Sequence, residues 1–108
     1  MHDHSKLNHN LIPNEQIIGD MIDLLKVTAD STRLKILLSL IDGEKNVCCI
    51  QELTGKSQSL VSHQLQVLKK QNLVRTRNEQ NRVYYAIADD HIQKLLEVVF
   101  DHVMEEKI

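Results

Sequence analysis

The stretch that decides the fold runs from residue 47 to residue 70 and reads VCCIQELTGKSQSLVSHQLQVLKK. Its first part predicts a short helix over Val47–Thr54, and Gly55 then supplies the positive φ that commonly ends a helix. Ser57 is a favourable N-cap for a second helix. The apolar residues of that second helix recur on one face: Val61, Leu65 and Leu68. Two helices joined by a short glycine-containing turn form the helix-turn-helix pattern.

Two strand-like segments follow the second helix, at residues 73–77 and 82–87, with a polar tip at residues 78–81. A hairpin placed after a helix-turn-helix predicts a winged helix. Asp89 or Asp90 then caps a final helix, whose apolar residues are Ile92, Leu95, Leu96, Val99 and Val103. The predicted fold class is therefore mostly α with a two-stranded β wing.

Upstream of residue 47 the pattern predicts two more helices. Asn14 caps the first, whose apolar residues recur at helical spacing: Ile17, Ile18, Met21, Ile22 and Leu25. Asp30 or Ser31 caps the second, which bears Leu34, Leu37, Leu38 and Ile41 and should stop near Gly43. Residues 1–13 are polar, contain His2, His4 and His9 and end at the only proline, so we expect a mobile arm. Residues 14–108 are expected to form one winged-helix DNA-binding and dimerisation domain. Its modest core is of the size that small proteins often extend by forming homodimers.

Composition narrows the class of protein. Hydrophobic residues make up 42% of the chain, but with no Trp, one Phe and two Tyr the core must be aliphatic. No secretion signal and no apolar run of roughly 20 residues is present, which argues against a membrane partner. Cys48 and Cys49 are adjacent and cannot form an ordinary disulfide framework, so a reducing, cytoplasmic location is expected.

The formal net charge of −2 is distributed unevenly. Residues 54–88 carry six basic side chains and one acidic side chain, a balance of +5, whereas residues 89–108 have a balance of −4. The central segment is therefore suited to an anionic partner and the C-terminal segment to cations.

The second helix of the helix-turn-helix has the side chains expected of a DNA-reading helix. Its polar face could reach base edges in the major groove, through Ser57, Gln58, Ser59, Ser62 and His63. Basic residues at its end and in the hairpin suit phosphates: Lys69, Arg75, Arg77 and Arg82. The simpler alternative is an ordinary solvated face, but the basic wing favours double-stranded DNA. His63 has no second ligand at i+3 or i+4, so we place it on the DNA face.

The last helix carries a candidate metal site made of Asp89, His91, His102 and Glu105. His91 and His102 share a face, but 11 residues at 1.5 Å per residue separate them by roughly 16 Å, so one ion cannot bind both in one chain. If two copies of the helix pack antiparallel, Asp89 and His91 of one chain meet His102 and Glu105 of the other. The apolar seam for this packing would consist of Leu95, Leu96, Val99 and Val103. The alternative is an acidic amphipathic helix that happens to contain two histidines.

Residues 27–105 resemble the ArsR/SmtB family of metal-responsive repressors. The resemblance lies in DSTR at 30–33, SQ at 57–58, VSH at 61–63, YY at 84–85 and the ligand spacing of the last helix, which matches the family's zinc sensors. It implies a homodimeric repressor that releases operator DNA when Zn(II) binds those four residues. It also implies that the second ring nitrogen of His102 donates to a backbone carbonyl near Gln71 or Asn72.

Several alternatives stay open. The family's soft-metal sensors have C-x-C where this chain has Asn46, Val47 and Cys48, so a site using Cys48 and Cys49, for thiol oxidation or a soft metal, is a second hypothesis. The N-terminal histidines resemble those of nickel and cobalt sensors, and Co(II) or Ni(II) also suits the ligands. A metal-buffering protein is a third hypothesis. An enzyme acting on a small organic substrate is not expected, because four protein ligands close the zinc tetrahedron.

Overall fold

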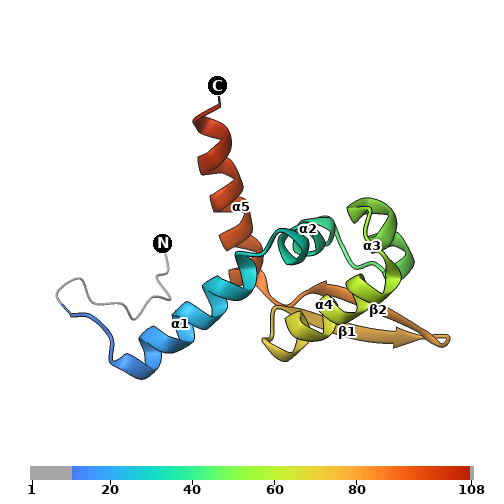
Figure 1. The fold of residues 1–108 in the computed structure, drawn as a ribbon, viewed down its shortest axis with the longest axis horizontal. Helices are drawn as coiled ribbons and strands as arrows, with labels where there is room; N and C mark the ends of the chain where they lie inside the picture. The colour runs from blue at the N-terminus through green and yellow to red at the C-terminus, as the bar shows by residue number, and fades with distance from the viewer. Residues whose placement is uncertain (1–10, 108) are drawn as a thin grey trace.

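The fold of residues 11–107 is described by a computed structural model, shown in Figure 1. His2, His4 and His9 lie outside these residues. The elements follow the order α1 (Glu15–Thr28), α2 (Ser31–Ser39), α3 (Val47–Thr54), α4 (Gln58–Lys70), β1 (Val74–Glu79), β2 (Arg82–Ile87) and α5 (Asp90–Glu105). The predicted winged helix-turn-helix is confirmed. None of the helices among residues 11–107 has the length and apolar character needed to cross a membrane.

The helix starts follow from capping side chains. The side chains of Asn14, Asp30, Ser57 and Asp89 each accept a hydrogen bond from a backbone N–H three residues ahead, at 3.0–3.2 Å. Asp30 rather than Ser31 therefore caps α2. The cap of α3 was not predicted: Asn46 accepts from the backbone N–H of Cys49 at 3.0 Å. Each of these bonds satisfies one of the free donors of a first helical turn.

The core lies between α2, α3, α4, the wing and the first half of α5. It is aliphatic as expected, with Tyr85 as its single aromatic member. Val61, Leu65 and Leu68 of α4 are fully buried, which confirms the predicted inner face of that helix. In α2, Ile36, Leu37 and Leu40 fill the core, while Leu34 and Leu38 are 36% and 42% exposed. The reason is that α2 has two apolar sides, and the second faces α5.

The wing is an antiparallel hairpin whose register pairs Arg75 with Ala86 and Glu79 with Arg82. The predicted tip of four residues was too long. β1 continues to Glu79, and the turn is made by Gln80 and Asn81 with φ of 50° and 65°. Positive φ at both central residues is typical of the two-residue turns that match strand twist. Lys45, in the loop after α2, pairs with Tyr85 through two backbone hydrogen bonds, of 2.8 and 2.9 Å.

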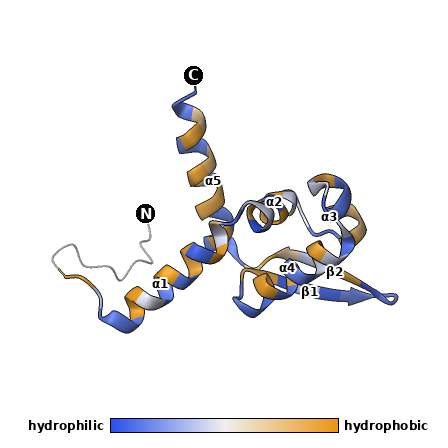
Figure 2. Cartoon of the chain, viewed as in Figure 1, coloured by the Kyte–Doolittle hydropathy of each residue, from blue (hydrophilic) through white to orange (hydrophobic). Residues whose placement is uncertain are grey.

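α1 and α5 project from this body, and Figure 2 shows apolar residues along both. The radius of gyration is 15.7 Å, larger than the roughly 13 Å of a compact chain of this length. Ile17, Met21, Ile22 and Leu25 of α1 are 44–52% exposed, so the apolar stripe that predicted this helix is not covered within the chain.

Two glycines provide a matched test of this fold. Gly55 ends α3 with φ of 72°, and Gly19 lies inside α1; an added Cβ would meet nothing within 4 Å at either position. Gly55→Ala should lower the free energy of unfolding by about 1 kcal/mol because alanine strains at positive φ. Gly19→Ala should raise it by about 0.5–1 kcal/mol because alanine favours the helix. Urea unfolding measures both changes, and effects of the same sign would contradict this explanation.

Candidate functional site

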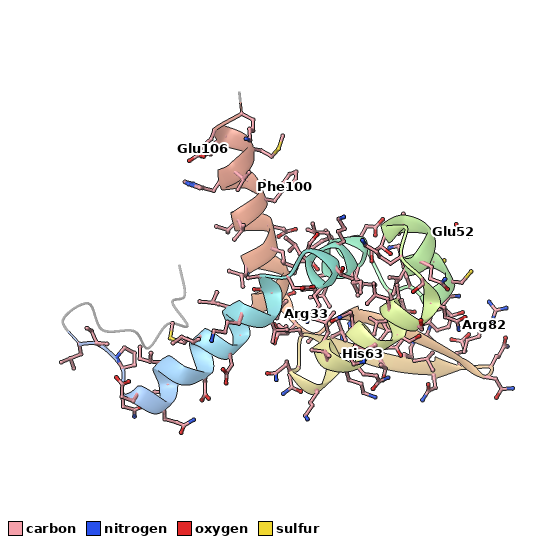
Figure 3. The ribbon with its side chains drawn as sticks, viewed as in Figure 1. Arg33, Glu52, His63, Arg82, Phe100 and Glu106 are labelled. Atoms are coloured by element: carbon pink, nitrogen blue, oxygen red, sulfur yellow. The ribbon has the colours of Figure 1, made fainter. Side chains whose placement is uncertain are left out.

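The first turns of α4 present their polar side chains to solvent. Ser57, Gln58, Ser59 and His63 are exposed and Ser62 is half-buried. Because the opposite face of the helix is anchored in the core, these residues cannot turn inward. Figure 3 labels His63 on this helix. The structure therefore brings the five predicted base-reading residues together on one open surface.

The wing brings its three arginines onto a single face. Residues directly opposite in an antiparallel pair share a face, and alternate residues of a strand do so too. Arg75 and Arg77 lie opposite Ala86 and Tyr84, and Arg82 lies opposite Glu79. All three arginines are exposed, as is Lys69 near the end of α4. The predicted phosphate-binding residues are therefore all open to an anionic partner, with the three arginines on one face of the wing and Lys69 on α4.

Arg77 is held differently from the other two arginines. Its Nε donates to both carboxylate oxygens of Glu44, at 3.1 and 3.2 Å, and Nη1 donates to Glu79. The guanidinium also lies 4.8 Å from the ring centre of Tyr84. Hydrogen bonds to the two carboxylates raise the pKa of Arg77, and its guanidinium lowers the pKa of Glu44. In the part of the chain that the structure describes, Arg75 and Arg82 make no ion pair.

The four predicted metal ligands lie exposed at the two ends of α5. At its start, Asp89 caps the helix, and its Oδ1 lies 3.9 Å from His91 Nδ1. At its end, His102 and Glu105 lie one turn apart. Because α5 is continuous, its 11-residue spacing holds the two histidines roughly 16 Å apart. Among residues 11–107, no three His, Cys, Asp or Glu side chains gather within one chain to hold an ion.

One residue at this end of α5 was not predicted from the sequence. His102 Nε2 lies 3.7 Å from Glu106 Oε1, so a second carboxylate stands one turn after the histidine. The i, i+4 spacing of these residues is visible in the sequence and could have identified the pair.

The predicted coupling residues lie at the C-terminal end of α4. Gln71 caps that helix, and Asn72 follows with φ of 61°. Figure 1 shows α5 pointing away from this end of α4, and among residues 11–107 the ring of His102 lies near Glu106 instead. Cys48 and Cys49 are exposed thiols in the first turn of α3 and line a shallow hollow with Arg82 and Tyr85.

An apolar groove lies between α1, α2 and α5. It has a volume of about 490 Å³, and the apolar residues lining it include Leu25, Leu34, Leu38, Val99, Phe100 and Val103. Phe100, labelled in Figure 3, is 55% exposed and Val99 is 53% exposed. Leu96, predicted as part of an intermolecular seam, is instead only 5% exposed because it packs into the chain's own core.

Comparison with known proteins places this geometry in a family. Residues 30–76 match the family model described as bacterial regulatory protein, arsR family. The chain is 38% identical to a transcriptional repressor SmtB homolog from Synechocystis over 79% of this chain and 64% of the relative. It is 34% identical to a cadmium resistance regulatory protein CadC homolog from Staphylococcus aureus, over 80% of this chain and 72% of the relative.

A solved structure agrees with these relatives. The homodimeric winged helix-turn-helix DNA-binding domain of Mb0332 from Mycobacterium bovis superposes with a TM-score of 0.78 at 33% identity, covering 84% of each chain. The relatives are transcription regulators, so the expectation that this chain is not an enzyme is confirmed. The chain belongs to the ArsR family of bacterial regulatory proteins.

Proposed function

We propose that this chain is a repressor that binds double-stranded operator DNA as a homodimer and releases it when Zn(II) binds between the α5 helices of the two subunits. The observation that carries the proposal is the division of four ligating residues into two exposed pairs at opposite ends of one helix. Neither pair has enough ligands to close a zinc site, and the two pairs are complementary in an antiparallel dimer.

The DNA-binding part of the proposal rests on α4 and the wing. Hydroxyl, amide and imidazole groups on the first turns of α4 can contact base edges, since the first turns of a recognition helix meet the bases. The exposed basic side chains of Lys69, Arg75 and Arg82 can contact phosphates, which supply most of the affinity. Two such units related by a two-fold axis would read two half-sites.

The homodimer part rests on the apolar surface of α1 and α5. Val98, Val99, Phe100 and Val103 are 47–64% exposed, and the groove beside them is apolar. Exposed apolar surface of this kind favours a partner that covers it. A second copy fits because the relative with a similar fold is itself homodimeric.

The residue numbers of the ligands are consistent with antiparallel packing of two α5 helices, because both ligand pairs are centred at nearly the same point of the helix. If His91 of one chain meets His102 of the other, the two-fold axis passes between residues 96 and 97. Asp89 then meets Glu105, because that pair is centred on residue 97. Val98 lies on the same face as both histidines, being seven residues after His91. This side chain is 64% exposed and would face Leu95 of the partner subunit across the axis.

The donor set of two imidazoles and two carboxylates suits Zn(II), which takes four nitrogen, oxygen or sulfur ligands in a tetrahedron. Asp89 has one oxygen engaged as a cap and a second oxygen free for the ion. The bound ion would supply a fixed link between the subunits. Co(II) and Ni(II) accept the same donors, and the titration below separates these ions.

Release of DNA follows from coupling between the two sites. Zinc would favour a dimer shape in which the two α4 helices no longer fit successive major grooves. Since the coupling is reciprocal, operator DNA should weaken zinc binding by the same factor. Contact between His102 and a carbonyl near Gln71 or Asn72 would transmit the change, and it requires a dimer geometry different from the single chain in Figure 1.

An operator titration with and without Zn(II), Co(II) and Ni(II) tests the proposal. We expect a specific, salt-dependent shift that zinc reverses. The Cys48→Ser/Cys49→Ser variant should behave like the wild type. Loss of the metal response in that variant would transfer the sensing role to the two thiols. Zinc binding without an operator shift at any salt concentration would indicate a metal-buffering protein instead.

Two of the three wing arginines, Arg75 and Arg77, should differ in their contribution to DNA binding. Arg75→Ala should reduce the slope of log affinity against log salt by about 1, as expected for one lost phosphate contact. Arg77→Ala should change the slope less, because Glu44 and Glu79 already neutralise its guanidinium. Binding measured by fluorescence anisotropy at several salt concentrations checks this. Equal changes in slope would show that Arg77 leaves its carboxylates for a phosphate.

A further inference from the structure

Arg33 joins three helices through two hydrogen bonds of its guanidinium. Its Nε donates to the backbone carbonyl of Val27 at 2.7 Å, and Nη1 donates to Gln64 Oε1 at 3.0 Å. Arg33 itself lies in the first turn of α2, where Asp30 accepts a hydrogen bond from its backbone N–H at 3.0 Å. Figure 3 shows Arg33 where the end of α1 comes near α4. The side chain is half-buried, so solvent screens it only partly.

The hydrogen bond from Arg33 to Val27 gives a donor to a free carbonyl at the end of α1. The last four carbonyls of a helix lack helical partners, and this end carries a partial negative charge. The carbonyls of Leu25 and Lys26 accept from the backbone N–H of Ala29, while that of Val27 accepts from the Arg33 guanidinium. A cation at this position therefore fixes where α1 ends relative to α2.

The bond to Gln64 extends this link to the reading helix. Gln64 lies in the second turn of α4, next to His63, and is half-buried. Its carbonyl oxygen is used by Arg33. The planar guanidinium can serve two acceptors at once in fixed directions, whereas a lysine ammonium is a single flexible point charge.

We propose that Arg33 is a positioning residue that sets the orientation of α4 relative to α1, and so couples the apolar helices of the dimer to the DNA-reading surface. The effect of Arg33 on DNA binding rests on the proposed function. Its effect on the relative orientation of α1 and α4 does not depend on DNA binding. The same link would carry a change of dimer shape from α1 to the bases.

A double-mutant cycle tests the proposal. Arg33→Met and Gln64→Leu should each lower the ratio of operator affinity to non-operator affinity by about tenfold, the scale of one charge-assisted hydrogen bond. The double variant should be no worse than Arg33→Met alone, because both changes remove the same bond. Additive losses would contradict the proposal and indicate that Gln64 contacts DNA directly. Lys35→Met removes a cation from the same helix, where Lys35 is exposed, and should leave the ratio unchanged.

A measurement without DNA separates this inference from the proposed function. In the Cys48→Ser/Cys49→Ser background, spin labels at Asp23→Cys on α1 and Gln66→Cys on α4 report the distance between these helices. Gln64→Leu and Arg33→Met should each broaden or shift the distance distribution. If Arg33→Met fails to fold, Arg33→Lys replaces it and should have the same effect. An unchanged distribution would overturn the inference even if the wild type binds its operator. A changed distribution in a chain that binds no operator would instead overturn only the proposed function.

Discussion

His102→Ala should bind operator DNA as tightly as the wild type without metal and should lose the response to zinc. The reason is that His102 lies near the end of α5, far from α4 and the wing, and is exposed. Its imidazole supplies one of four proposed ligands, so its loss opens the zinc tetrahedron. A wild-type release of about 100-fold corresponds to about 2.7 kcal/mol of coupling free energy. In the variant, we expect less than about threefold, or under 0.7 kcal/mol.

The measurement is an operator titration at saturating zinc and in the presence of a chelator. His63→Ala is the matched control, because it removes a histidine from α4 instead of α5. That variant should bind operator less tightly yet keep its full zinc response. A zinc response that persists in His102→Ala would remove His102 from the sensing site.

The second large effect is expected from Val98→Lys. In the proposed dimer, Val98 lies near the two-fold axis and is covered by the partner subunit. A lysine there would bury an unpaired charge in each subunit, one helical turn from the same charge of the partner subunit. Such burial costs several kcal/mol, so the dimer dissociation constant should rise at least about 100-fold. Operator affinity should fall with it, because a single reading unit contacts only one half-site.

Sedimentation equilibrium measures the change in dimerisation, and circular dichroism checks that the helices remain. Glu97→Lys is the control, since it places the same side chain one residue earlier, about 100° around the helix. We expect that variant to remain dimeric. A dimeric Val98→Lys variant that still binds zinc would exclude the antiparallel packing of α5.

Local rules predicted much of the fold. Asn14, Ser57 and Asp89 cap helices as expected because a short polar side chain before an apolar repeat has few better hydrogen-bond partners. Gly55 ends α3 because positive φ strains other residue types. These features depend on a few neighbouring residues, which explains why the sequence alone identifies them.

Features that depend on distant residues could not be predicted in the same way. Arg77 was assigned to phosphate from its type and position, but Glu44, 33 residues earlier, reaches it in the folded chain. The length of the wing turn depended on Gln80 and Asn81 both taking positive φ, which polar composition does not reveal. The two apolar sides of α2 needed the position of α5 before they could be distinguished.

The candidate metal ligands were identified by their spacing, and their arrangement in two separated pairs follows from the continuous helix α5. The remaining question is which chain completes each pair, and neither a single sequence nor a single chain contains that information. Val98 was overlooked because the predicted seam consisted of Leu95, Leu96, Val99 and Val103, of which Leu96 is buried in the chain's own core. Val98 is 64% exposed on the same face as the histidines, and this exposure is seen in the structure but not in the apolar pattern of the sequence.

Complementation between two variants tests most directly whether each zinc ion is shared by two subunits. One chain carries His91→Ala and the other His102→Ala, and the heterodimer is purified through different affinity tags. If the ligands come from different subunits, each homodimeric variant has one ligand missing from both of its zinc sites. The heterodimer, by contrast, has one complete site, formed by His91 of one chain and His102 of the other. We predict one tightly bound zinc ion per heterodimer by calorimetry, and a heterodimer that binds zinc no better than the two homodimers would contradict the account.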